Sequence, residues 1–386
     1  MDQSSAGFGV YVHWPFCQSK CPYCDFNSHV SDSVNQDAWQ RALVAELDWA
    51  TQALKADNET LPTVTSIFFG GGTPSLMPPA TTEAVISRIQ DHFHTASDLE
   101  ITLEANPSSV EAAKFRDFAQ AGVNRLSLGI QALDDTALQF LGRAHDHTQA
   151  LQAIDIAAKT FDRYSFDLIY ARPDQTPSQW RTELKTALEL TGEHLSLYQL
   201  TIETGTPFAR DGIKACNDII GEELYQITQD MLQTAGLPAY EISNHAKPGA
   251  ECRHNLTYWR GGGFLGIGPG AHGRLNRADG WQSHYRVHTP ARWLELVQQN
   301  GHGTAKETLI SSEERLEEAL LMGLRLNAGI TVENFKAATG QDLHSSFDTQ
   351  AVKRLTEGGF LVQDAAGMRA TPEGLLRLNA VIAQLV

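Results

Sequence analysis

The sequence predicts an α/β protein whose parallel sheet curls towards a barrel, followed by a smaller, mainly helical module. From residue 9 to residue 200, strand patterns alternate with helix patterns in about six units, the order that a parallel sheet requires. Right-handed crossovers in such a sheet favour a barrel. Polar or glycine-rich loops follow the strands, and the sites of such folds gather at that edge.

Buried strands are expected where short apolar runs end in turn residues. These runs are 9–13, 64–69, 99–104, 125–129, 164–169 and 194–200. Helices are expected where apolar residues recur every three or four positions, as Trp39, Leu43 and Leu47 do in the first of them. The helical segments are 37–54, 81–93, 109–121, a stretch from Asp134 onward, and 177–190.

The second half of the chain is less regular. A helix is expected at 221–234 and a strand at 239–243. From about residue 307 the pattern gives helices at 312–326, 332–339 and 346–357, a hairpin of 360–362 with 368–370, and a last helix from Thr371. Three helices with a small hairpin are similar to a winged-helix module. We therefore divide the chain into residues 1–215, a connecting region of 216–305, and a winged-helix-like domain of 306–386.

Composition limits the function classes. With 42% hydrophobic and 20% charged residues the 386-residue chain is typical of a soluble globular protein, and no apolar run is long enough to cross a bilayer. The net charge of −16 argues against a general nucleic-acid binder, which needs a basic surface. The start at Met1–Gly7 is polar and unlike a signal peptide, so we expect a cytoplasmic protein with reduced thiols.

Three of the five cysteines fall within eight residues, at Cys17, Cys21 and Cys24. Thiolates at this density favour an iron–sulfur cluster or zinc. Zinc with His13 or His29 as a fourth ligand is the weaker alternative, and a disulfide is weaker still because three cysteines do not pair evenly. The cluster is the favoured interpretation. A standard [4Fe–4S] cluster takes four protein ligands, and the fourth is missing here, because Phe26 stands where a nearby cysteine might have been.

Further polar residues follow the predicted strands. Gly70–Pro74 allows the backbone to approach a ligand closely, although a tight turn without a ligand is the alternative. Glu104 ends a strand and has the chemistry to accept hydrogen bonds from ribose hydroxyls. Individually, Gln131, Arg143 and Asp167 are weak candidates, because each could equally be a solvated or salt-bridged side chain. Their shared position at strand ends is what favours a common site.

His254 lies in a short motif, His-Asn-Leu-Thr-Tyr-Trp, that combines an imidazole with aromatic rings. Histidine is a common haem ligand, and aromatic side chains line porphyrins. On the residues alone, a hydrogen-bonded structural histidine is the favoured interpretation, and the same holds for His272. Cys216 and Cys252 are interpreted as ordinary thiols.

The chain resembles the branch of the radical S-adenosylmethionine (SAM) superfamily that contains the oxygen-independent coproporphyrinogen III oxidases and the heme chaperones of the HemW family. The matching stretches, in order, are Tyr11–Cys17, Cys21–Ser28, Phe69–Ser75, Glu104–Pro107, Asn124–Gln131, Leu141–Arg143, Phe166–Tyr170 and His254–Trp259. The resemblance implies a partial (β/α)6 barrel with a smaller C-terminal domain. It also implies chemistry in which a cluster electron cleaves SAM to a 5′-deoxyadenosyl radical.

Site residues follow from the same resemblance. Cys17, Cys21 and Cys24 would bind a [4Fe–4S] cluster whose open iron holds SAM. The SAM site would be lined by Tyr11, Tyr23, Gly71, Gly72, Thr73, Glu104, Gln131, Arg143, Asp167 and Thr201. One departure concerns the SAM site: the family usually reads Asp-Leu-Ile-Tyr-Gly-Leu-Pro, and Ala171-Arg172 replaces Gly-Leu here. If that turn needs a left-handed residue, Ala171 is strained.

Two features indicate whether the chain is more similar to the oxidases or to the chaperones of this branch. The decarboxylating oxidases carry a fourth cysteine at the position of Phe26 and a longer N-terminal extension, whereas the stretch from Cys252 to Trp259 is typical of the chaperones, in which the histidine is held to bind haem. The sequence therefore predicts a heme chaperone with haem at His254. Its partners would be haem and haem-receiving proteins such as respiratory enzymes, with a dimer as a possible assembly.

Two rival functions stay open. One is the coproporphyrinogen III oxidase itself, and the other is a nucleic-acid-modifying radical SAM protein that uses the C-terminal module. SAM binding is expected, coproporphyrinogen oxidase activity is not, and whether SAM is cleaved in function stays open.

Overall fold

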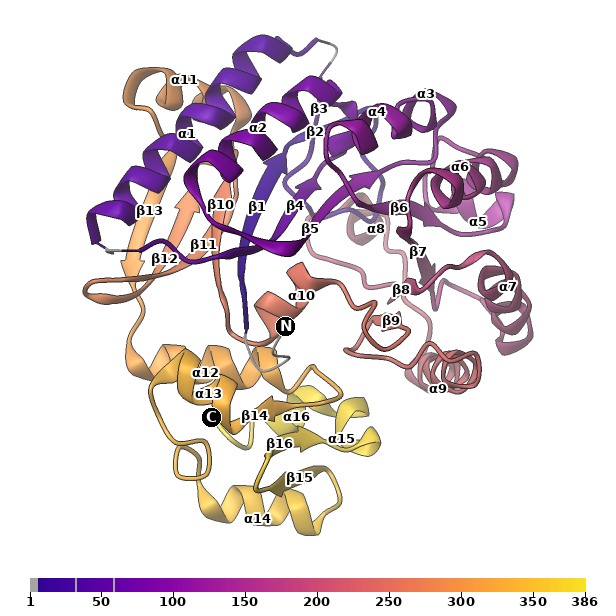
Figure 1. Cartoon of the computed structure of the whole chain (residues 1–386). Coiled ribbons are helices and arrows are strands. Elements are labelled where there is room, and N and C mark those ends of the chain that lie inside the picture. The colour runs from indigo at the N-terminus through magenta and orange to yellow at the C-terminus, as the bar shows by residue number, and fades with distance from the viewer. Residues whose placement is uncertain (1–5, 32, 58–59) are drawn as a thin grey trace.

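The computed structural model describes residues 6–31, 33–57 and 60–386 (Figure 1). Most of the polar N-terminal stretch used above to argue against a signal peptide, residues 1–5, therefore lies outside the described residues. Among the helices of the described ranges, none is both long and apolar enough to span a bilayer.

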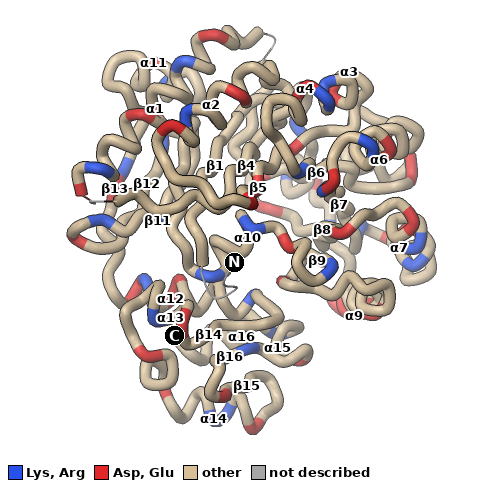
Figure 2. The backbone as a smooth tube through the Cα atoms, in the orientation of Figure 1, with Lys and Arg blue, Asp and Glu red and all other residues tan. Residues whose placement is uncertain are grey.

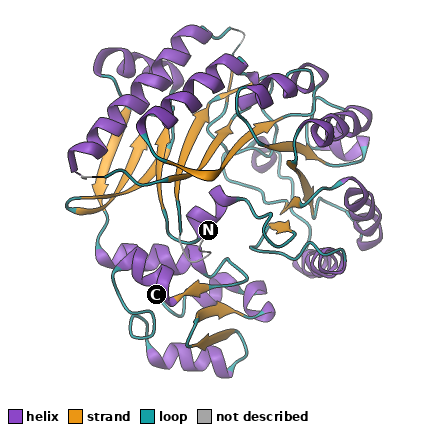
Figure 3. Ribbon diagram, viewed as in Figure 1, coloured by secondary structure: helices purple, strands orange, loops and turns teal. Residues whose placement is uncertain are grey.

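The described residues form one large curved sheet of eleven strands (Figures 1 and 3). Its order is β13-β12-β11-β10-β1-β4-β5-β6-β7-β8-β9. The parallel strands are β1 (Phe8–Trp14), β4 (Val64–Gly71), β5 (Thr95–Ala105), β6 (Arg125–Gln131), β7 (Arg163–Tyr170), β8 (His194–Gln199) and β10 (Gly263–Ile267). The antiparallel strands are β9 (Asn244–Ala246), β11 (His272–Arg277), β12 (Gly280–Arg286) and β13 (Thr304–Leu309).

Helices surround the outside of the curved sheet (Figure 3). They are α1 (Gln36–Asp57), α2 (Pro79–His92), α3 (Ser109–Ala112), α4 (Phe115–Gln120), α5 (Asp135–Phe140), α6 (His147–Thr160), α7 (Pro177–Leu190) and α9 (Asp218–Thr234), with α11 (Pro290–Asn300) beside α1. Because helices cover the strands, β1 and β4 consist mostly of apolar residues. The core includes Trp39, Leu43 and Leu47 of α1, and the Trp39 ring stacks on Trp293 of α11 at 5.1 Å between centroids.

Two local predictions are wrong. The helix expected at 109–121 is broken into α3 and α4, and the strand expected at 239–243 is a turn that precedes β9. The turn forms because Tyr240 N–H donates to the Asn244 carbonyl at 3.1 Å, which folds the segment back on β9. Strands β10, β11 and β12, within the region 216–305 that we expected to connect two domains, extend the main sheet, and so does β13, which begins in that region and ends at Leu309.

The C-terminal part forms its own core. It contains α12 (Ser312–Gly323), α13 (Val332–Thr339) and α14 (Thr349–Glu357), a three-stranded sheet of β14 (Ile330–Thr331), β16 (Gly367–Ala370) and β15 (Leu361–Asp364), and the short helices α15 (Pro372–Leu376) and α16 (Leu378–Ile382). Leu320, Phe335 and Leu355 are buried among these elements. The fold class is therefore confirmed, and the domain boundaries at 215/216 and 305/306 stay a prediction.

One buried carboxylate joins α1 to the strands that extend the sheet. Glu46 is fully buried and accepts backbone N–H groups from Gly268 at 2.8 Å and Gly303 at 2.7 Å. It also accepts the indole N–H of Trp293 at 3.0 Å and lies 3.6 Å from the buried guanidinium of Arg286. These partners come from residues after β10, before β13 and in α11 and β12, so a single side chain holds the extension against α1.

A strained turn follows β7. Ala171 has φ of +56°, in the left-handed region that penalises a Cβ. The next residue, Arg172, is buried and donates to Glu183 of α7 at 2.6 Å and to the Ile169 carbonyl at 2.9 Å. The turn therefore keeps a conformation suited to glycine, and the ion pair of Arg172 with Glu183 stabilises it.

We expect Glu46→Ala to lower the free energy of unfolding by about 3–5 kcal/mol, because it leaves a buried guanidinium and three buried donors without their acceptor. Denaturant unfolding measures the change. The control Glu189→Ala, on the exposed side of α7, should change stability by no more than about 0.5 kcal/mol. Equal effects of the two variants would contradict a special role for Glu46.

We expect Ala171→Gly to raise the free energy of unfolding by about 1 kcal/mol, since glycine adopts a positive φ without the Cβ penalty. The matched control is Ala158→Gly, an exposed position in α6, which should lower stability by about 1 kcal/mol. Both are measured by denaturant unfolding. A loss of stability in both variants would show that the turn after β7 is not strained.

Candidate functional site

Two adjoining cavities are bordered by residues of the parallel strands and of the loops that follow them, and the second also by residues of α10 and α12. The first, which we call the cysteine pocket, has a volume of about 480 Å³ and is bordered by the three clustered cysteines. The second, which we call the aromatic pocket, has a volume of about 580 Å³. Phe26, Gly71 and Glu104 border both cavities, so the two meet at these residues.

Most of the predicted site residues border the cysteine pocket. They are Cys17, Cys21, Cys24, Tyr23, Gly71, Gly72, Thr73, Glu104, Gln131, Arg143, Asp167 and Thr201. Two predicted residues lie elsewhere: Tyr11 borders the aromatic pocket, and His254 borders neither of these cavities. The ligand of each residue stays a prediction, but folding does bring residues from six strand ends into one cavity.

The cysteine loop leaves β1 and is closed by two short paired strands, β2 (Phe16–Cys17) and β3 (His29–Val30). Cys17 Sγ accepts from the Thr73 hydroxyl at 3.4 Å, and Cys21 Sγ accepts from the Arg143 guanidinium at 3.2 Å. Burial raises the pKa of the Cys17 thiol, and the Thr73 hydrogen bond opposes that shift. Donors directed at two sulfurs suit thiolates that bind metal.

The loop fits a cluster better than a zinc ion. Among the described residues, no group of three or more His, Cys, Asp or Glu side chains surrounds a single metal position. Each thiolate of a cubane cluster binds a different iron, so its sulfurs need not converge on one ion. Both ring nitrogens of His13, one of the two histidines considered as a fourth zinc ligand, already have partners, in the Tyr11 hydroxyl at 3.0 Å and the Asn27 carbonyl at 2.9 Å. The other, His29, bonds the Asn27 side chain through Nε2 at 3.0 Å.

The glycine loop packs directly on the cysteine loop. Gly71 has φ of +113°, and a Cβ there would meet the His13 ring at 2.6 Å, while a Cβ on Gly72 would meet the Phe16 carbonyl at 2.7 Å. Gly72 and Thr73 N–H groups donate to the carbonyls of Trp14 and Phe16 at 2.7 and 2.8 Å. Only glycines allow this close approach, so they fix the distance between β4 and the cysteines.

Two half-buried carboxyl groups, Glu104 and Asp167, border the cysteine pocket. Burial, with the negative charge of Asp167 as the second cause, raises the pKa of Glu104 to about 8. Burial also raises the pKa of Asp167 to about 6, against the hydrogen bond from Ser196 and the charges of Arg125 and Arg143. Acids with raised pKa values in a cavity are typical of binding sites.

Asn106 is a site residue that the sequence analysis did not single out. Its amide nitrogen donates to Thr73 Oγ1 at 3.0 Å, and its Oδ1 accepts from Arg143 at 2.5 Å. It therefore links the glycine loop to Arg143. Its place two residues after Glu104, in the Glu-Ala-Asn-Pro stretch, is the signal in the sequence that could have identified it.

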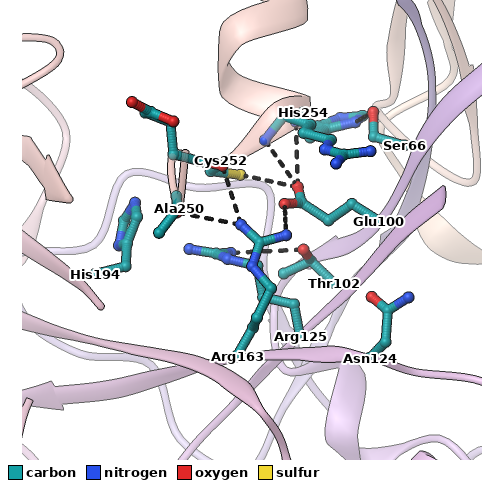
Figure 4. Close-up of polar contacts among 12 residues, drawn as sticks. Ser66, Glu100, Thr102, Asn124, Arg125, Arg163, His194, Ala250, Cys252 and His254 are labelled. Carbon is teal, nitrogen blue, oxygen red and sulfur yellow. Dashed lines mark hydrogen bonds and ion pairs between the residues drawn. The ribbon is translucent and has the colours of Figure 1, made fainter. Parts of the chain in front are cut away.

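His254 is enclosed by protein. It lies in α10 (Arg253–Trp259), is 1% exposed, and its Nδ1 bonds Ser66 Oγ at 2.9 Å; Figure 4 shows His254 beside Ser66. Its Nε2 bonds the Tyr258 hydroxyl at 2.6 Å. Its ring stacks on Phe68 at 5.0 Å between centroids. Burial lowers the pKa of His254 to about 3, so the ring is neutral at physiological pH.

Glu100 of β5 holds the start of α10 in place (Figure 4). Its buried carboxylate accepts the backbone N–H groups of Arg253 at 2.9 Å and His254 at 3.3 Å. It also pairs with Arg163 of β7 at 2.7 Å and accepts from the Cys252 thiol at 3.5 Å. The motif of His254 is therefore attached to the barrel by its first residues, and Tyr258 and Trp259 at its end reach the aromatic pocket.

Comparison with known proteins gives the class first: this is a radical SAM protein. The sequence model of the Radical SAM superfamily matches residues 11–187, and that of the HemN C-terminal domain matches residues 310–377. Escherichia coli coproporphyrinogen III oxidase (HemN) superposes with a TM-score of 0.80 at 21% identity, over 99% of this chain and 90% of the oxidase, which shows the shared fold.

Relatives in sequence give the family. The heme chaperone HemW of Escherichia coli is 40% identical, over 97% of this chain and 96% of its own. The HemW of Haemophilus influenzae is 35% identical with the same coverage. The bovine mitochondrial radical S-adenosyl methionine domain-containing protein 1 is 40% identical, over 98% of this chain and 87% of its own. The chain belongs to the HemW/HemN-like family of radical SAM proteins, and the resemblance drawn from the sequence is confirmed.

We expect the stability of the SAM-free protein to fall as the pH rises from about 5 to about 8, relative to Glu104→Gln. The pKa of Glu104 is raised to about 8 in the folded protein, above its value in the unfolded chain. The stabilising contribution of the neutral carboxyl is therefore complete below the unfolded pKa. It is lost as the pH rises through the folded pKa of about 8. The change in the difference between the two proteins should be roughly 3–5 kcal/mol.

Denaturant unfolding at a series of pH values measures that difference. The matched control is Glu189→Gln, which removes an exposed carboxyl and should run parallel to the wild type. Parallel curves for the wild type and Glu104→Gln would mean that Glu104 is not held neutral by burial.

Proposed function

We propose that this protein is a heme chaperone: it binds haem, a [4Fe–4S] cluster and SAM, and delivers haem to haem-requiring proteins such as respiratory enzymes. The observation that carries the proposal is the aromatic pocket of about 580 Å³, which adjoins the cysteine pocket and is walled by Tyr11, Tyr258, Trp259 and Phe264. A flat, apolar macrocycle with polar edges suits such a cavity. The relatives that match nearly the whole chain and carry the name heme chaperone support the same function.

The cysteine pocket suits a cluster and SAM. When bound, these two cofactors supply radical chemistry. Cys17, Cys21 and Cys24 would hold the cluster, and Arg143, which contacts Cys21, would offset the negative charge of the thiolates. Glu104 and Asp167 would supply acceptors for hydroxyl or amino groups of a nucleoside-like ligand. Gly71 and Gly72 let that ligand approach the backbone.

The second candidate is coproporphyrinogen III oxidation, which the fold shared with HemN favours. Against it stands Phe26, which occupies the position of the fourth cysteine of the oxidases and is 65% exposed between the two cavities. A nucleic-acid substrate has less support, because Lys and Arg are scattered among acidic positions in both parts of the chain (Figure 2). We propose the cytoplasm as the compartment because a cysteine cluster requires reduced thiols, although several relatives are named mitochondrial.

The test uses the full chain with its cluster reconstituted under anaerobic conditions. Haem is titrated into the protein and followed in the Soret region, and the loaded protein is then mixed with an apo-globin. We expect stoichiometric binding, followed by transfer of the Soret band to the globin's position. The same preparation is incubated with coproporphyrinogen III, SAM and a reductant, and no decarboxylated product is expected.

Matched controls separate the cofactors. The triple variant with Cys17, Cys21 and Cys24 each changed to Ala should lose the absorbance of the cluster but keep haem binding, because the aromatic pocket does not contain these residues. Product formed at enzymatic rates, together with no haem uptake, would replace the chaperone with the oxidase. Haem that binds but never leaves would contradict delivery.

A further inference from the structure

We propose that Asn106 is a positioning residue that directs hydrogen-bond donors at two of the three clustered cysteines and so sets how easily a bound cluster is reduced. Asn106 connects Arg143 to Thr73. The guanidinium group of Arg143 therefore acts on Cys21 directly and on Cys17 through this connection. The inference rests on the proposed binding of a [4Fe–4S] cluster, and it concerns residues that hold the cysteine sulfurs rather than bind iron.

The orientation of the Asn106 amide follows from the chemistry of its neighbours. Arg143 can only donate hydrogen bonds, so the Asn106 atom that lies 2.5 Å from its Nη2 must be the carbonyl oxygen Oδ1. The amide nitrogen then faces Thr73 Oγ1 at 3.0 Å and donates to it. Turning the amide round would place donors of Asn106 and Arg143 against each other, so this series of hydrogen bonds runs in one direction.

Thr73 extends the same series of hydrogen bonds to a sulfur atom. Its hydroxyl oxygen accepts from Asn106, so its own proton is directed elsewhere, and Cys17 Sγ lies 3.4 Å away. Thr73 is buried, and its backbone N–H donates to the Phe16 carbonyl at 2.8 Å, which holds the residue beside the cysteine loop. A donor directed at a sulfur favours the thiolate form, which is the form that binds metal.

Arg143 contacts the second sulfur. Its Nη1 donates to Cys21 Sγ at 3.2 Å, while its Nη2 donates both to Asn106 and to the Gly129 carbonyl, the latter at 2.8 Å. The Gly129 carbonyl holds one end of the guanidinium group without help from Asn106. Loss of the Asn106 side chain should therefore affect the donor at Cys17 more than the donor at Cys21.

A buried carboxylate fixes the backbone of Asn106. Glu111 of α3 is 1% exposed, and its Oε2 accepts the Asn106 N–H at 2.9 Å. The same carboxylate accepts from the hydroxyl groups of Ser75, which follows the glycine loop, and of Ser108. One group therefore holds both Asn106 and the end of the glycine loop, which keeps Asn106 at hydrogen-bonding distance from Thr73.

Hydrogen bonds to cysteine sulfurs change the reduction potential of an iron–sulfur cluster. Reduction adds negative charge, so donors at the sulfurs stabilise the reduced form more than the oxidised form. We expect Asn106→Ala to lower the ratio of reduced to oxidised cluster at a fixed potential about tenfold, because a charge-assisted hydrogen bond is weakened. The midpoint potential should accordingly become more negative.

The experiment is a potentiometric titration of full-length, SAM-free protein with its cluster reconstituted, followed anaerobically by electron paramagnetic resonance of the reduced form. Thr73→Val removes the donor to Cys17 and should shift the midpoint in the same direction as Asn106→Ala. Thr73→Ser keeps a hydroxyl and should titrate like the wild type. The matched control is Gln199→Ala, which removes another amide that borders the cysteine pocket and should leave the midpoint unchanged.

The double variant of Asn106→Ala with Thr73→Val tests whether Asn106 acts through Thr73. If it does, Asn106→Ala should shift the midpoint less than half as far in the Thr73→Val protein as in the wild type. Equal shifts in the two proteins would overturn the proposed connection. An unchanged midpoint in Asn106→Ala would overturn the whole inference.

The remaining outcomes separate this inference from the proposed function. A wild-type protein that forms no cluster would overturn the proposed cluster binding and this inference together. Haem uptake and delivery are measured in a separate experiment, so their failure would contradict the chaperone and leave the midpoint comparison as it is.

Asn106→Asp replaces Asn106→Ala if the alanine variant does not fold, as judged by far-UV circular dichroism. A carboxylate still accepts from Arg143 but has no proton to donate to Thr73. The midpoint should again become more negative, and by more than in Gln199→Glu, which adds the same charge beside the same cavity. An equal or smaller change than in Gln199→Glu would overturn the inference.

Discussion

The arrangement of the two cavities depends on the ion pair and the hydrogen bonds made by the buried carboxylate of Glu100. It joins β5 to β7 through Arg163 and receives the first N–H groups of α10, so the helix begins at a fixed point of the barrel. From there α10 carries His254 into the core and Tyr258 and Trp259 to the aromatic pocket. Arg315 then reaches back to the Gly261 carbonyl, which attaches α12 to the same place. A carboxylate buried without these partners would be strongly unfavourable.

The shared border of the two cavities joins one ligand to the other. Phe26, Gly71 and Glu104 face both of them, so any molecule in the aromatic pocket lies against the wall of the cysteine pocket. Gly71 also donates to Glu104 at 3.3 Å, which ties the glycine loop to that wall. A change in the protonation of Glu104 therefore changes the charge that borders both cavities. The fold is shared with an oxidase, and a fold by itself does not determine function, which depends on the residues of the site.

Local patterns in the sequence were enough for the barrel strands, whereas most residues of the cysteine pocket could be named only from the resemblance to a known family. Strand periodicity placed Glu104 and Asp167 at strand ends, and parallel pairing then brought the two together. Long-range pairing was beyond local patterns: nothing near residue 263 indicates that β10 joins β1, or that three more strands follow. The environment of His254 was equally hidden, because its partner Ser66 is distant in sequence. For the same reason Tyr11 could not be separated from the cysteine pocket that it was expected to line.

Strand β1 lies inside the sheet, with β4 on one side and β10 on the other. Val10 pairs with Ile67 and also with Leu265, so one of its neighbours is made early and the other very late in synthesis. Until the ribosome has passed residue 267, one edge of β1 has no partner strand, and the cysteine loop that follows it is exposed on an incomplete barrel. Such non-local closure is slow and leaves an open strand edge that invites aggregation. The nascent chain must therefore stay soluble through most of its own translation before β1 has a partner strand on both sides.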